Sequence, residues 1–151
     1  MKKKFSHVDP RGEARMVDVT AKPVQFREAV AVGEVRMKPA TIELIEAKQV
    51  AKGNVFAAAR LAGIMAAKQT ASLIPLCHPL AITHCEVAFE IPLRHDRVLI
   101  RATTKVAAPT GVEMEALTAV CVAALTIYDM CKAVDKNMRI TGVKLKSKTK
   151  K

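Results

Sequence analysis

Four stretches of the chain alternate between apolar and polar residues, which is the pattern of β-strands with one buried face. The two central runs are separated only by the tetrapeptide Leu-Arg-His-Asp at 93–96, so together they predict an antiparallel hairpin. The first run is rich in valine and carries charges at alternate positions. The predicted strands cover residues 26–37, 85–91, 98–106 and 138–146.

Three segments between these runs carry apolar residues three or four positions apart, as amphipathic helices do. The first helix is predicted to begin near Pro39, because proline is favourable in a first turn, and to continue to residue 50. A break at 52–54 precedes an alanine-rich helix at 55–72. The longest helix is predicted from Glu113 to about Ala133.

The elements follow the order strand, helix in two pieces, strand, strand, helix, strand. This order is the split βαβ arrangement, so we expect an α+β fold of the ferredoxin-like type. In such a sandwich the sheet is antiparallel and the helices pack on one of its faces. A chain of 151 residues without repeats or a visible linker predicts a single domain, 1–151. The proline-containing segments 5–25 and 72–80 are expected to be irregular.

The positive charge of the chain is concentrated at its two ends. The net charge is +11, but eight lysines lie at 2–4 and after residue 143, which leaves residues 5–143 with 17 basic and 14 acidic groups. Lysine-rich ends are usually solvated, so 1–4 and about 146–151 are predicted to be basic flexible tails. The apolar fraction of 50% excludes a disordered chain.

The cysteines and apolar segments limit the compartment and the cofactors. None of the four cysteines forms a C-x-x-C pair, so the sequence supports no zinc or redox framework, and no metal site is predicted. The start of the chain lacks the apolar stretch of a signal peptide. The most apolar segment, 116–128, is shorter than the roughly 20 residues of a membrane span. We therefore expect a soluble cytoplasmic protein with no membrane partner.

Acidic and basic side chains interrupt the longest predicted helix. Glu115, Asp129 and Lys132 fall within about 100° of one another around its axis. Lys132 can reach Asp129, either as an ordinary surface ion pair or as an acid–base pair of a site. Glu115 and Asp129 are 14 residues apart, so about 21 Å separates them along the helix. A compact site cannot contain both from one chain: either the substrate is long, or a neighbouring subunit supplies one end.

Two loops carry further candidates. His78 is flanked by prolines at 75 and 79, which stiffen the loop, and histidine is a common acid–base group near neutral pH. An ordinary loop histidine is the alternative. The neighbouring Cys77 is not expected to form a nucleophile pair with it, because adjacent side chains in extended backbone point apart. Lys52, followed by Gly53 before a helix start, is a plausible phosphate contact, although the pattern is short.

Several segments together resemble one family, the cyclic pyranopterin monophosphate synthases, which are the C proteins of molybdenum-cofactor biosynthesis. The resemblance runs in order from about residue 6 to 145, and its last two motifs are highly specific. The motifs are MVDV (16–19), KGNVFAAARLAGIMAAK (52–68), LIPLCHPL (73–80) and TGVEMEALTAVCVAALTIYDMCKAV (110–134).

The resemblance implies a lyase that converts 3′,8-cyclo-7,8-dihydroguanosine 5′-triphosphate, made by an upstream radical enzyme, to cyclic pyranopterin monophosphate and pyrophosphate. It also implies a homohexamer built as a trimer of dimers, with the active site at a dimer interface. No redox cofactor is expected, since the carbon–carbon bond already exists in the substrate. The sequence leaves open whether a divalent metal accompanies the triphosphate.

The same resemblance assigns roles to particular residues. Asp129 and Lys132 are implied to be the catalytic acid–base pair, with Lys52 and His78 in the catalytic set. A lysine beside other cations in a partly dry pocket can have its pKa lowered and act as acid or base. Asp129 would hold Lys132 in place or relay its proton. The implied substrate-binding residues are Leu76, Cys77, His78, Glu113, Met114 and Glu115.

The chain departs from the family pattern at two positions, and there are two alternatives to the synthase. Pro109 stands where the family usually has a basic residue, so a phosphate contact is missing, and Asn54 replaces a more usual aspartate. An inactive homologue is therefore one alternative. A ferredoxin-like nucleic-acid-binding module is the other, but it requires exposed aromatic residues on the central strands. Phe89 shares a strand face with Val87 and is expected to be in the core.

Overall fold

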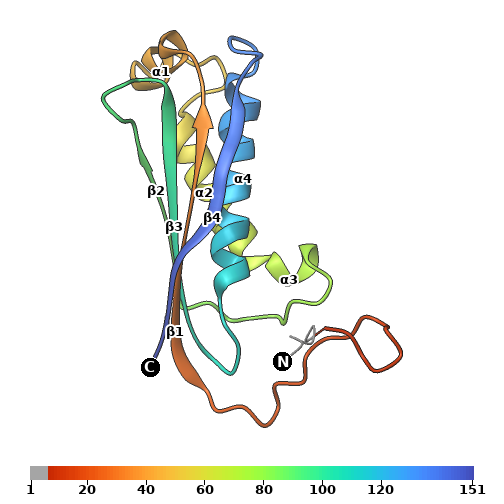
Figure 1. Cartoon of the computed structure of the whole chain (residues 1–151). Coiled ribbons are helices and arrows are strands. Elements are labelled where there is room, and N and C mark those ends of the chain that lie inside the picture. Colours follow the sequence, from red (N-terminus) through yellow and green to blue (C-terminus); the bar gives the residue numbers. More distant parts are fainter. Residues whose placement is uncertain (1–6) are drawn as a thin grey trace.

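Strands and helices follow one another in the predicted order (Figure 1). The computed structural model describes residues 7–151, so the predicted tail at 1–4 lies outside the described residues. The elements are β1 (Gln25–Arg36), α1 (Pro39–Glu46), α2 (Val55–Lys68), α3 (Thr70–Leu73), β2 (His84–Glu90), β3 (Arg97–Ala108), α4 (Glu113–Cys131) and β4 (Arg139–Lys150).

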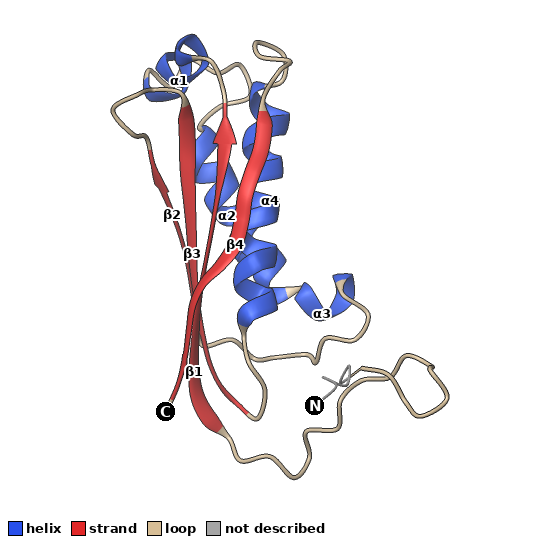
Figure 2. Cartoon of the chain, viewed as in Figure 1, coloured by secondary structure: helices blue, strands red, loops and turns tan. Residues whose placement is uncertain are grey.

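The four strands form one sheet in the order β2-β3-β1-β4, and every neighbouring pair is antiparallel. The helices lie on one face of this sheet, and the other face carries none (Figure 2). Strand order and helix placement confirm the predicted α+β fold of the ferredoxin-like type. The hairpin of β2 and β3 is also confirmed, with Val87 opposite Ala102.

The core lies between the sheet and the helix pair α2 and α4. Small residues along α4, such as Ala116 and Ala123, are fully buried and let this helix approach the sheet closely. A Cβ added at Gly63 of α2 would lie 2.9 Å from the carbonyl oxygen of Ala119, so the two helices are in near-backbone contact. By length and composition alone α4 could cross a membrane, but more than half of it is buried in this core.

The helices end earlier than their composition predicts. α1 ends at Glu46 rather than at residue 50, because the backbone turns into the left-handed region at Lys48, where φ is 55°. The predicted helix at 55–72 divides into α2 and the short α3 around Gln69. The segment that follows α3 is irregular, as its two prolines predict.

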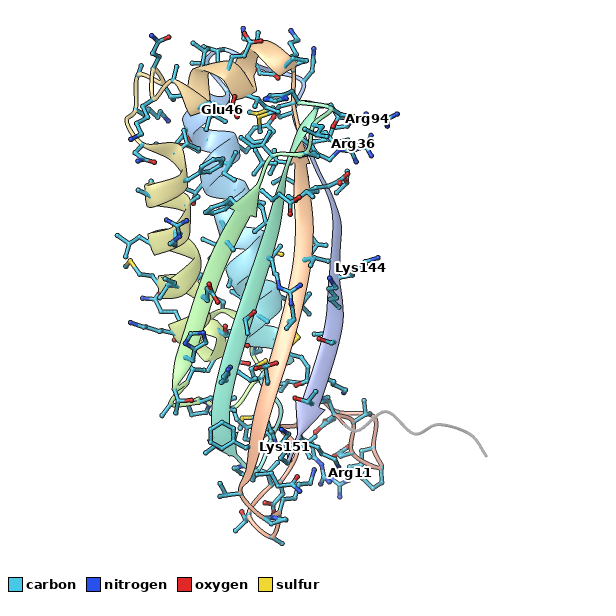
Figure 3. The ribbon with its side chains drawn as sticks, turned by 90° about the vertical axis from the view of Figure 1, so that its left-hand side faces the viewer. Arg11, Arg36, Glu46, Arg94, Lys144 and Lys151 are labelled. Carbon is cyan, nitrogen blue, oxygen red and sulfur yellow. The ribbon has the colours of Figure 1, made fainter. Side chains whose placement is uncertain are left out.

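The predicted flexible tail at 146–151 is wrong for most of its length. β4 continues to Lys150, and Lys151 exchanges backbone hydrogen bonds of 2.9 Å with Phe26 in both directions. A lysine-rich segment can form an edge strand because its side chains reach solvent while its backbone pairs with β1. Figure 3 shows β4 along one edge of the sheet, with Lys144 projecting from it.

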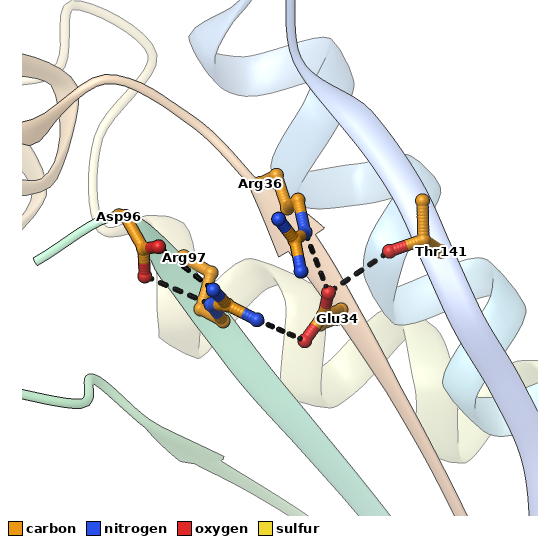
Figure 4. Close-up of polar contacts among 5 residues, drawn as sticks. All are labelled: Glu34, Arg36, Asp96, Arg97 and Thr141. Carbon is orange, nitrogen blue, oxygen red and sulfur yellow. Dashed lines mark hydrogen bonds and ion pairs between the residues drawn. The ribbon is translucent and has the colours of Figure 1, made fainter. Parts of the chain in front are cut away.

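A cluster of ion pairs joins three strands at one end of the sheet (Figure 4). Arg36 Nε and Thr141 Oγ1 donate to one carboxylate oxygen of Glu34, at 2.8 and 3.0 Å. Arg97 donates to the other oxygen at 3.1 Å and also forms a forked pair with Asp96. Hydrogen bonding to Arg36, and then to Arg97, lowers the pKa of Glu34. These contacts hold β1 against β3 and β4.

Asp135 connects the end of the α4 region to the start of α1. Its side chain is only 1% exposed. One carboxylate oxygen accepts from Lys38 N at 2.8 Å and from Thr41 Oγ1 at 3.2 Å, and the other accepts from Asn137 N at 3.1 Å. Burial raises the pKa of Asp135, but the hydrogen bonds from Lys38 and Asn137 outweigh it, so the pKa is lowered. The carboxylate thus takes the place of a side-chain cap, which α1 lacks at Lys38.

We predict that Asp135→Ala lowers the free energy of unfolding by about 2–3 kcal/mol at pH 7, since buried donors lose a charged acceptor. A lowered folded-state pKa stabilises the fold above the usual carboxyl value of about 3.9. That contribution is lost as the pH falls through the lowered pKa. Urea unfolding at pH 7 and about pH 3 should therefore show a smaller difference at the lower pH. The exposed neighbour Lys136→Ala is the control, and an equal effect of both variants would contradict the capping role.

Candidate functional site

Three of the predicted catalytic residues meet at the C-terminal end of α4. Asp129 lies in the last turn of the helix, Lys132 is its C-terminal cap, and Lys52 comes from the loop between α1 and α2. Lys132 Nζ lies 2.6 Å from Asp129 Oδ1, and Lys52 Nζ lies 2.7 Å from Oδ2. Lys52 Nζ also donates to the backbone carbonyl of Asp129 at 3.0 Å. One carboxylate therefore holds two ammonium groups on the same side of the molecule.

The charges of this cluster fix its protonation state. The hydrogen bond from Lys132, and then that from Lys52, lowers the pKa of Asp129 to about 2. In return the hydrogen bond to Asp129 raises the pKa of Lys132. At neutral pH the carboxylate is ionised and Lys132 is protonated. The side chains are 48–56% exposed, so the ion pairs contribute little to stability and leave the ammonium groups accessible.

A second cluster lies at the other end of α4, around a cavity of about 290 Å³. The loop after α3 forms one wall, and the start of α4 forms the other. Thr104 Oγ1 donates to the carbonyl of Val112 at 3.0 Å and fixes where the helix begins. All six predicted substrate-binding residues line this cavity, which is bounded by His7, Leu76, Cys77, His78, Leu80, Thr110, Gly111, Glu113, Met114 and Glu115.

The tautomer of His78 follows from its hydrogen bond. Its Nε2 lies 2.8 Å from the carbonyl oxygen of Val17, and a carbonyl oxygen can only accept. Nε2 therefore carries the proton, and in the neutral ring Nδ1 is free to accept one. The contact also ties the N-terminal segment to the loop after α3.

Glu115 and Cys77 also line this cavity, and the pKa of each is raised. Glu115 is 4% exposed, and burial together with the charge of Glu113 raises the pKa of its carboxyl group. Burial, and then the Glu115 charge, raises the pKa of the Cys77 thiol, so the sulfur is not activated as a nucleophile. The cavity thus combines a carboxyl group whose pKa is raised with a histidine whose Nδ1 has no hydrogen-bond partner among the described residues.

The charge balance at the start of α4 involves residues that the sequence did not single out. Lys148 of β4 pairs with Glu113 at 3.0 Å. Burial raises the pKa of Glu113, but the hydrogen bond from Lys148 outweighs it and the pKa is lowered. A Cβ at Gly111 would collide with the Glu113 carboxylate, so a larger residue there would displace the end of that side chain. The sequence signal for Lys148 is the alternation of lysines along β4, which composition alone predicts to be a solvated tail.

The structure does not bring all predicted catalytic residues together within one chain. His78 belongs to the cavity at the start of α4, whereas the lysines and Asp129 lie at its end, about 21 Å away along the helix. A larger hollow of about 430 Å³ lies on the open face of the sheet and contains none of the predicted residues. Within residues 7–151, no three His, Cys, Asp or Glu side chains converge as a metal site would require.

The fold and the site define the class first: a ferredoxin-like α+β protein with acid–base groups divided between the two ends of one helix. Comparison with known proteins then identifies the family. The model of the MoaC family matches residues 16–151, and the chain belongs to this family.

Curated relatives match nearly the whole chain. The cyclic pyranopterin monophosphate synthase of Parvibaculum lavamentivorans is 58% identical over 97% of this chain and 92% of its own length. The protein of the same name from Roseiflexus sp. is 56% identical over 96% of this chain and 92% of its own. Cyclic pyranopterin monophosphate synthase 1 of Mycobacterium bovis is 58% identical over 96% of this chain and 85% of its own.

We predict that Asp129→Asn leaves thermal stability nearly unchanged but lowers the pKa of Lys132 towards the ordinary lysine value. The reason is that the exposed ion pairs stabilise the protonated lysine much more than they stabilise the fold. A ¹³C NMR titration of the lysine Cε signals would measure the shift, with Lys136 as an internal reference. An unchanged Lys132 titration would show that the ion pair does not form in solution.

Proposed function

We propose that the chain converts 3′,8-cyclo-7,8-dihydroguanosine 5′-triphosphate to cyclic pyranopterin monophosphate with release of pyrophosphate. The chain is an enzyme of the cyclic pyranopterin monophosphate synthase family, which acts in molybdenum cofactor biosynthesis. The observation that carries the proposal is the intact cluster of Lys52, Asp129 and Lys132 in a chain this similar to named synthases. The substrate and the role of each residue are the proposed part.

The residue types suit a reaction made of proton transfers and phosphate chemistry. Opening the imidazole ring, rebuilding a pterin and closing a cyclic phosphate require an acid and a base but no net oxidation or reduction. In the proposal Lys132 is the acid, because its pKa is raised and it is protonated at neutral pH. Asp129 positions both lysines, and Lys52 neutralises phosphate charge. No redox cofactor enters the proposed reaction.

The second cluster supplies complementary groups in this proposal. His78, with its Nδ1 free, acts as a base, and Glu115, whose pKa is raised, donates a proton or a hydrogen bond to the purine-derived ring. Leu76, Cys77 and Met114 form the apolar part of the cavity that holds the ring. Glu113 lies next to them, and its ion pair with Lys148 holds its carboxylate in place.

The proposed site is completed by a second copy of the chain. About 21 Å separates the two clusters within one chain, which is too far for one small substrate to contact both. A two-fold interface can place the end of one α4 near the start of the partner's α4. By symmetry it would then form two complete sites in each dimer. The proposal accordingly includes a homohexamer assembled as a trimer of dimers. It also includes a cytoplasmic location and an upstream radical enzyme that supplies the substrate.

The features of this chain favour the synthase over the two alternatives. Asn54 accepts from Ala57 N at 3.0 Å and caps α2, so its departure from the family pattern retains the structural role. Phe89 faces the helices, where its ring stacks on Phe56 at 4.9 Å. Phe26, at the start of β1, is the one exposed aromatic residue on the described strands, and RNA-binding sheets use two or three.

We predict single-turnover conversion of the purified cyclised substrate, followed as pyrophosphate release and pterin product. Lys132→Ala and Asp129→Ala should each reduce the rate by roughly 10² or more, since acid–base groups contribute about that factor. Lys136→Ala is the matched control, because it removes an exposed lysine four residues along the chain from Lys132. A folded, oligomeric parent without turnover would favour the inactive homologue.

A shared site makes a second prediction, which tests the subunit arrangement independently. His78→Ala and Lys132→Ala damage opposite ends of α4, so each should be inactive alone. Co-expressed mixed oligomers would regain about a quarter of the parental activity, because in half of the dimers one of two sites lacks both substitutions. Activity that stays at the level of the separate variants would place all the groups of a site in one chain.

A further inference from the structure

A β-bulge changes the direction of the lysines along β4. Val30 pairs with Ser147 while Ala31 pairs with Leu145, so Lys146 has no partner on β1. Before the bulge, Lys144 lies opposite Val32 on the open face of the sheet. After it, Lys148 lies opposite Ala29 of the core and reaches Glu113 on the helix side. Lys150 follows two residues later, on the same side as Lys148.

The redirected end of β4 borders a hollow of about 530 Å³. Its basic groups come from three places: Lys22 from the segment before β1, Arg27 from β1 and Lys150 from β4. No acidic side chain lines it. The described residues around it are Lys22, Pro23, Gln25, Arg27, Pro109, Thr110, Gly111 and Lys150.

The cations of this hollow are arranged at an electrostatic cost. Arg27 and Lys150 are direct cross-strand partners, and like charges in that position repel. Arg27 is held by backbone carbonyls, donating to Ala108 at 3.1 Å and to Pro109 at 3.2 Å. Among residues 7–151, neither Lys22 nor Lys150 has an acidic partner within 4 Å. An anion in the hollow would relieve the repulsion.

The hollow adjoins the proposed substrate cavity. Thr110 and Gly111 line both, so a single loop separates the basic hollow from His78 and Glu115. Pro109 lies in this loop at the position where the family resemblance implies a basic residue. Proline contributes no cation there, and its carbonyl is already occupied by Arg27. The end of β4 therefore brings positive charge to the place where the loop lacks it.

We propose that Lys150, together with Lys22 and Arg27, binds the phosphate chain of the substrate and replaces the basic residue absent at Pro109. The identity of the substrate rests on the proposed function, whereas the polyphosphate site rests on the hollow and its charges. Lys150 neutralises phosphate charge and does not take part in proton transfer, so it affects substrate binding rather than the chemical step.

Inorganic tripolyphosphate is the probe that separates the two proposals. Isothermal titration calorimetry of the full chain should show binding that Lys150→Ala weakens about tenfold, the effect of one lost charged contact. Lys144→Ala is the matched control, because it removes the same charge from the same strand on the other side of the bulge. If both variants weakened tripolyphosphate binding equally, the binding would depend on the net charge of the chain and not on this hollow, and the proposal would be overturned.

Kinetics and rescue complete the test. With the cyclised triphosphate, Lys150→Ala should raise KM about tenfold and leave kcat within about twofold. The double variant Lys150→Ala, Pro109→Arg should recover most of the lost affinity, because it restores a cation on the loop. Unchanged KM and unchanged tripolyphosphate binding in Lys150→Ala would overturn the site. Tripolyphosphate binding that depends on Lys150 in a parent without turnover would retain the site and reject the synthase function.

Discussion

The length and rigidity of α4 constrain everything else in this molecule. An α-helix rises 1.5 Å per residue, so its two functional ends stay about 21 Å apart whatever the loops do. Burial of its alanine-rich face against the sheet fixes the position of the whole helix in the core. The loops before α2 and after α3 then deliver Lys52 to one end and His78 to the other. The separation of the two candidate clusters is therefore a property of the core, not of the loops.

The two ends of α4 differ in their exposure to water, and their chemistry differs accordingly. At the exposed end, ion pairs with Asp129 keep Lys132 protonated at the cost of little stability. At the enclosed end, desolvation raises the pKa of Glu115. The pKa of an ammonium group and that of a carboxyl group are thus both raised, the first by ion pairing and the second by desolvation. Buried contacts, such as the hydrogen bonds of Asp135, stabilise the fold instead.

Most of the fold could be predicted from the chain because alternation and helical spacing report directly which faces are buried. The motif residues of α4 were likewise visible, although their separation into two clusters required the positions of Lys52 and His78 in space. The end of β4 was not predictable in the same way. Composition describes the solvation of lysines, but backbone pairing with β1 and the bulge at Lys146 depend on register, which one sequence does not report.

The near-contact between Gly63 and Ala119 has a consequence for how this enzyme can change over time. A larger side chain at Gly63 would separate α2 from α4. The segments that contain Lys52 and His78 lie before and after α2 in the chain, so both clusters would move. A compensating substitution would then be needed on the facing helix, so the two positions are expected to vary together. Selection for catalysis would in this way act on residues that never meet the substrate.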